Sequence, residues 1–198
     1  MAIAGAVVLR TADRAPRRRR VVVAAVVLAI LAILIVLLAV RWHNPQPYSG
    51  DEPHYLLLTN SLFLDGDVDV KSDYLTGRYL GYYPFPIDPH VNWSVFTPAS
   101  PHWYSQHGIG LPALLVPAVV ADDARGATVA MVVIAVVVLL LTFLWARRFT
   151  GEAWFAVIAT GALGLSPFFL GLQGRIFPDL AAAALLLGCL LLLEMSER

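Results

Sequence analysis

An acidic pair, Asp51 and Glu52, follows the first long apolar run of the chain and stands directly before Pro53. A carboxylate there can act as a general base on an attacking hydroxyl, or can help to bind a divalent metal. Proline suits the first turn of a helix, so a helix is expected to begin at Pro53 with Glu52 at its cap. The pair is therefore interpreted either as catalytic, at a membrane surface, or as a helix cap, and the spacing leaves both open.

The elements that must position this pair are those of a membrane protein. The chain is 59% hydrophobic and 14% charged, and the charges lie between the apolar runs. Uncharged runs long enough to cross a bilayer as helices cover residues 21–40, 126–146 and 153–173. Residues 180–193 form a shorter run, expected to be a fourth helix, complete or truncated. The predicted fold class is all-α integral membrane, with about four transmembrane helices.

The arginines predict the orientation. Arg17–Arg20 precede the first span and Arg147-Arg148 follow the second, so both groups are expected in the cytoplasm. Residues 1–20 would then be a basic cytoplasmic tail of a multi-pass protein of the cell (plasma) membrane. Outer loops would cover residues 41–125 and 174–179. A cleaved signal peptide is the competing interpretation, but the apolar run is too long for one.

The first outer loop contains the groups that could do chemistry. All five histidines and all seven tyrosines lie in it, and it is too apolar and aromatic for a disordered linker. Helical elements are expected at residues 53–64 and 107–121, ended by Asp65-Gly66 and Asp122-Asp123. Both are too short to span, so they are predicted to lie at the membrane interface. The second could instead be a re-entrant helix. If residues 107–121 spanned instead, the orientation of everything downstream would invert.

Other sites are disfavoured. Asp65–Asp69 resembles the start of a calcium loop, but Val70 and Thr76 stand where such a loop needs glycine and glutamate, so an acidic turn is expected. The histidines lack the spacing of a zinc site made of histidine alone. The lone Cys189 provides no disulfide framework. Nucleic-acid binding is not expected, because the basic cluster faces anionic lipid.

An ordered set of motifs carries a resemblance to a known family. The set is Gly50–Tyr55, Asp65–Asp69, Tyr104–Pro112 and Ile176–Asp179. With the spans around it, this order resembles the N-terminal part of the C-type (GT-C) polytopic membrane glycosyltransferases. That superfamily includes protein O-mannosyltransferases and aminoarabinose-lipid A transferases. The resemblance covers residues 21–193.

The resemblance implies an activity and a set of partners. Such enzymes transfer a sugar from a polyprenyl-phosphate donor to a lipid, glycan or protein acceptor on the non-cytoplasmic side. It implies that Asp51 or Glu52 acts as base or metal ligand, and that Asp179 is a second acid in the next outer loop. Asp51 and Asp179 would hold a divalent metal, Mg²⁺ or Mn²⁺. The two interfacial helices match those expected in the first loop.

Further candidates follow from the chemistry of transfer. The departing phosphate gains charge, so a cation should meet it, and Arg175 is the candidate. Arg175 could equally pair with Asp179 or extend to the interface. His107, Tyr104 and His54 are candidate contacts for sugar or phosphate, with interfacial anchoring as the alternative.

The number of spans departs from the family pattern, since its members generally have many more. The chain is interpreted as a fragment, as a split enzyme that needs a partner subunit, or as a remnant. The rival function is a non-catalytic accessory or lipid-binding membrane protein that kept the scaffold. Transport is the weaker alternative, because the three long runs contain no ionisable residue.

Overall fold

The computed structural model describes residues 48–196 and, before them, the helical positions Val21, Ala24, Val27, Leu28, Ile30, Leu31, Ala32, Ile35 and Ala39. The predicted basic tail and most of the first predicted span therefore lie outside the described residues. The described part is mostly helical and contains no β-strand. This agrees with the all-α prediction. The element bounds are α2 Glu52–Asn60, a π-turn Ser61–Asp65, α3 Lys71–Thr76, a 3-10 turn Arg78–Gly81, α4 Gly110–Thr150, α5 Ala153–Gly164, α6 Pro167–Leu172 and α7 Pro178–Ser196.

Two of these helices, α4 and α7, are long and apolar enough to cross a membrane. This indicates a membrane protein, and the count of four spans remains a prediction. The segment expected as the third span is divided into α5 and α6. Ser166 is extended and accepts a hydrogen bond from the amide of Phe169, and Pro167 follows it, so a new helix begins there.

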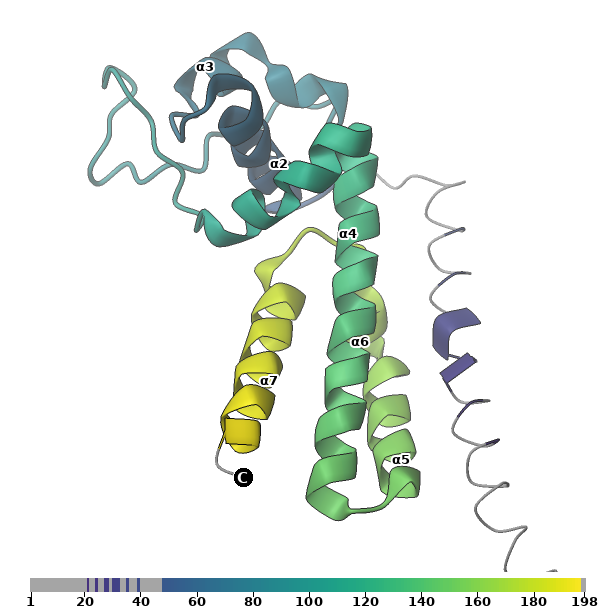
Figure 1. The fold of residues 1–198 in the computed structure, drawn as a ribbon. Helices are drawn as coiled ribbons and strands as arrows, with labels where there is room; N and C mark the ends of the chain where they lie inside the picture. The colour runs from purple at the N-terminus through teal and green to yellow at the C-terminus, as the bar shows by residue number, and fades with distance from the viewer. Residues whose placement is uncertain are drawn as a thin grey trace, which may run out of the picture.

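The helix α4 is broken at the acidic pair Asp122-Asp123. Both residues leave helical geometry, and Asp123 has a φ of 46°. The chain turns so tightly that a Cβ on Gly126 would lie 1.9 Å from the carbonyl oxygen of Ala118. Figure 1 shows the first arm of α4 lying across the end of the molecule, while the second arm runs along α5 and α7. The first arm, before the break, therefore runs in a different direction from the second arm, after it.

Residues 48–109, here called the cap, lie at one end of α7 and of the second arm of α4, and part of their later coil extends away from the helices (Figure 1). All nine residues of α2 are buried within the cap. An interfacial helix would expose one face, so α2 is instead a core helix of the cap; the exposed apolar residues Phe63 and Leu64 lie in the π-turn after it. One buried apolar cluster joins α2 to α4, Phe169, Ile176 and Leu180, and a second lies inside the cap.

The second half of the cap is coil. An isolated antiparallel bridge between Asp69 and Tyr104 holds it against the earlier part, and a second, between Val91 and Ser105, pairs two segments of the coil with each other. The cap is also fastened to the break in α4, because Tyr48 donates from its hydroxyl to the carbonyl of Ala124 at 2.9 Å. Long-range contacts therefore fix the cap where regular elements do not.

Candidate functional site

Asp51 occupies the N-cap position of α2, but among the described residues its carboxylate makes no capping hydrogen bond. Its backbone carbonyl accepts from the amides of His54 and Tyr55, both at 3.1 Å. The side chain is 45% exposed. The helix starts one residue earlier than predicted, and the cap residue is Asp51 rather than Glu52. The hydrogen bonds of its main-chain carbonyl thus hold Asp51 at the start of α2, while its carboxylate stays open to solvent.

Two imidazoles flank this carboxylate. His90 Nδ1 lies 3.3 Å and His107 Nε2 lies 3.9 Å from Asp51 Oδ1. The same two nitrogens lie 3.0 Å apart, so one donates a hydrogen bond to the other. Three potential ligand or proton-transfer groups thus converge from three separate parts of the cap.

The backbone holds His90 and His107 side by side. The bridge between Val91 and Ser105 pairs their segments, and Gln106 donates its amide to the carbonyl of His90 at 2.9 Å. The His107 amide donates to Ser105 Oγ at 3.1 Å. The backbone contacts therefore fix the two rings relative to each other although both residues lie in coil.

His54 forms the buried floor of the site. Its ring stacks on that of His90, with centroids 3.6 Å apart, and its Nδ1 lies 2.6 Å from the hydroxyl of Tyr74. Burial, followed by the neighbouring rings of His90 and His107, lowers the pKa of His54 to about 4. Burial likewise lowers the pKa of His107, against the opposing charge of Asp51. Both rings are therefore neutral at pH 7.

Glu52 is completely buried and has a different role from Asp51. Its Oε2 accepts from Arg175 Nη1 at 2.6 Å and from the Ser49 amide at 3.0 Å, and its Oε1 accepts from the Ile176 amide at 3.0 Å. This carboxylate joins the start of α2 to the loop before α7. Arg175, expected to meet a phosphate or to pair with Asp179, pairs with Glu52 and donates to Ser49 Oγ at 3.1 Å.

Asp179 lies exposed in the first turn of α7. Burial raises the pKa of Tyr55, and the charges of Asp51 and Asp179 raise it further, so both carboxylates lie within electrostatic range of one phenol. Tyr104 is a different case. Its ring packs on Phe96 and near His102, and among the described residues no hydrogen bond or ring contact joins it to the three converging groups.

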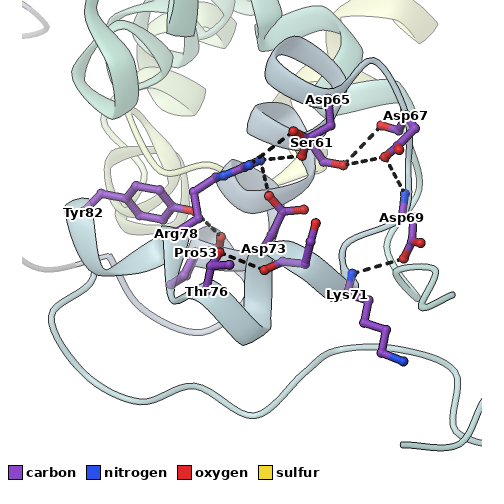
Figure 2. Close-up of polar contacts among 11 residues, drawn as sticks. Pro53, Ser61, Asp65, Asp67, Asp69, Lys71, Asp73, Thr76, Arg78 and Tyr82 are labelled. Carbon is purple, nitrogen blue, oxygen red and sulfur yellow. Dashed lines mark hydrogen bonds and ion pairs between the residues drawn. The ribbon is translucent and has the colours of Figure 1, made fainter. Parts of the chain in front are cut away.

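The acidic segment 65–69 is held by protein donors. Figure 2 shows Arg78 donating to Asp65, and Asp67 accepting from Ser61 Oγ and from the Asp69 amide. Asp69 also accepts from the Lys71 and Trp103 amides and contacts His102. These contacts make it the acidic turn that the sequence predicted.

Asp73 lies beneath the same arginine, as Figure 2 also shows. Its carboxylate is completely buried. Burial raises the pKa of Asp73 to about 6, although the charge of Arg78 opposes this. This residue is part of the interior of the cap and not of the candidate site.

Sequence reasoning missed His90 and Tyr74 as members of the site. His90 lies between Pro89 and Val91, in a coil with no helical or strand periodicity, and 39 positions separate it from Asp51. No spacing pattern could connect it to Asp51, because the connection depends on the paths of two coil segments.

The comparisons with known proteins add no relative. No protein-family model matches the chain, and no significant match was found among curated proteins or solved structures.

Proposed function

We propose that this chain is a membrane glycosyltransferase, or the N-terminal module of one. It would transfer a sugar from a polyprenyl-phosphate donor to a lipid, glycan or protein acceptor on the non-cytoplasmic side. One observation carries the proposal: the exposed carboxylate of Asp51 lies between two imidazoles on a cap at the end of apolar helices. A reactive group at that place can meet a lipid-linked donor and a water-exposed acceptor together.

The proposed reaction uses Asp51 as general base. The acceptor hydroxyl gives its proton to the Asp51 carboxylate while its oxygen bonds to the anomeric carbon of the sugar. The bond from that carbon to the phosphate oxygen breaks, and the polyprenyl phosphate leaves with the electron pair. His107, neutral at pH 7, supplies a hydrogen bond to the sugar side of the site, whereas the buried His54 ring supports His90 by stacking and does not reach the sugar.

Glu52 and Arg175 support the site from below in this proposal. Their buried contact ties α2 to the loop that leads to Asp179. Asp179 then belongs to the same outer face as Asp51, as their shared effect on Tyr55 supports. Arg175 remains the candidate cation for the departing phosphate, held in place by Glu52.

The proposal includes a membrane topology. The N-terminus is cytoplasmic, the cap is outside and about four helices span. The second arm of α4 then runs inward to Arg147-Arg148, which the positive-inside rule favours. Membrane lipids surround the helices, and a partner subunit can supply the further spans that the family pattern requires.

The test is sugar transfer in membranes containing the full chain, alone or with a co-expressed partner, from a radiolabelled polyprenyl-phosphate sugar. Asp51→Asn keeps the side-chain shape but removes the base, so the rate should fall about 10²–10⁴-fold. Asp88→Asn, an exposed acid of the same cap, is the matched control and should keep full activity. Both variants should insert at wild-type levels.

The rival is a non-catalytic accessory or lipid-binding protein. It predicts that the wild-type chain binds polyprenyl phosphate but transfers no sugar from any donor tested. Equal transfer by the Asp51 and Asp88 variants would remove Asp51 from the mechanism.

A further inference from the structure

We propose that Asp51, His90 and His107 form a binding site for one divalent transition-metal ion of the zinc class. The ligand atoms are Asp51 Oδ1, His90 Nδ1 and His107 Nε2, which all lie within 4.8 Å of one another. The inference does not depend on glycosyl transfer, because the same three atoms can bind a metal whatever reaction the protein catalyses.

The distances between these atoms match one face of a metal-centred tetrahedron. A zinc ion with ligand bonds of about 2.0–2.1 Å has its ligand atoms about 3.3 Å apart. The three separations in the cap are 3.0, 3.3 and 3.9 Å. Small side-chain rotations are therefore enough to place all three atoms around one ion.

The site is built before any metal arrives. The chain pairing at Val91 and Ser105 fixes the two histidine backbones, and the stacked ring of His54 supports His90 from the side. His107 packs against Tyr55, with ring centroids 4.7 Å apart. A rigid set of ligands loses little conformational freedom when the ion binds.

The ligand types select the metal. Two imidazole nitrogens and one carboxylate oxygen suit zinc and its first-row neighbours, whereas Mg²⁺ and Mn²⁺ favour oxygen ligands. The side chains are 9% exposed at His107, 32% at His90 and 45% at Asp51, so the site opens toward solvent on the Asp51 side. Three protein ligands with one open position are typical of catalytic zinc sites.

The test is metal binding by the full chain in detergent, purified with a tag free of histidine and stripped with a chelator. Titration with Co²⁺ should give the visible absorption of a four-coordinate site at one ion per chain, and Zn²⁺ should abolish it by displacement. His90→Ala and His107→Ala should each weaken binding by at least about tenfold, as loss of a ligand requires.

His102→Ala is the matched control. This histidine belongs to the same cap but contacts Asp69 instead of the three proposed ligands, so its loss should leave binding unchanged. Asp51→Asn should also weaken binding. Because Asp51 is exposed, this variant answers the question even if removal of the packed His107 ring unfolds the cap, which circular dichroism would reveal.

Two results would overturn the site. One is the absence of stoichiometric binding by the folded wild-type chain. The other is wild-type affinity in folded His90→Ala and Asp51→Asn variants. Either result leaves the base role of Asp51 intact, since the transfer assay measures that separately.

Discussion

Arg148 Nη1 lies 3.2 Å from Glu194 Oε2, so the C-terminal ends of α4 and α7 meet at the end of the molecule opposite the cap. The two helices long enough to span therefore run in the same direction. An intervening segment must return the chain to the cap side, and α5 and α6 do so in two pieces.

The first prediction concerns topology. With the cap outside, a single cysteine at Ser72 should react with a membrane-impermeant reagent applied to intact cells, and one at Thr150 should not. Both positions are exposed in the structure, so lack of reaction reports the side of the membrane rather than burial. The background is Cys189→Ser. Labelling at Thr150 from outside would show that the orientation is inverted.

The second prediction concerns the break in α4. Gly126→Ala places a methyl group against the Ala118 carbonyl, a backbone atom that cannot move away alone. The change should lower the free energy of unfolding by at least about 2 kcal/mol, measured by thermal or denaturant unfolding in detergent. Gly188→Ala in α7 is the control. Nothing lies within 4 Å of its new methyl, so it should be neutral or slightly stabilising. Equal stability of the two variants would show that the turn at 122–123 is more open than described.

The third prediction concerns Glu52. Arg175→Met removes the guanidinium that contacts the buried carboxylate of Glu52 and should destabilise the protein by about 2–3 kcal/mol. Adding Glu52→Gln removes the buried charge and should restore part of that loss. Unfolding in detergent of both single variants and the double variant measures the coupling. Strictly additive effects would mean that the two side chains do not interact in the membrane-bound protein.

The fourth prediction concerns pH. The folded pKa of Asp73, about 6, is above its value of about 3.9 in an unfolded chain. Between these values the folded state binds the extra proton, so the contribution of Asp73 to stability should fall as pH rises from about 4 to about 6. The lowered pKa of His54 contributes in the opposite direction over the same range, so the Asp73 effect is read as the difference between wild type and variant. Below pH 4 this penalty is absent, and above pH 6 it is constant at about 2–3 kcal/mol. Asp73→Asn should therefore gain stability relative to wild type as pH rises from about 4 to about 6, measured as the unfolding midpoint of both proteins against pH. A wild-type slope that the variant shares would assign the effect to other groups.

The helices followed from composition and from local signals. Long uncharged runs predicted the second arm of α4 and α7, and Asp122-Asp123 stands at the break because an acidic pair ends an apolar run. Pro53 and Gly66 similarly stand near the two ends of the α2 segment. Such signals act over a few residues and are visible in the sequence.

The different roles of Asp51 and Glu52 could not be predicted from such local signals. The two acids are adjacent and chemically alike, and they differ because Glu52 meets a loop 123 positions later. His90 approaches Asp51 only because a coil segment pairs with residues 104–106. Contacts between distant coil segments leave no periodic pattern, so local reasoning could not find them.

The contact between Glu52 and Arg175 also affects how the protein is made. A ribosome adding roughly 5–20 residues per second takes roughly 6–25 s to cover those 123 positions. Throughout that time the nascent cap lacks the Arg175 guanidinium and the Ile176 amide, two of the groups that contact the Glu52 carboxylate. The segment that forms α4, α5 and α6 must also be synthesised before these two groups emerge. The cap is therefore expected to mature late, so that synthesis halted before residue 175 would leave a species that quality-control proteases recognise.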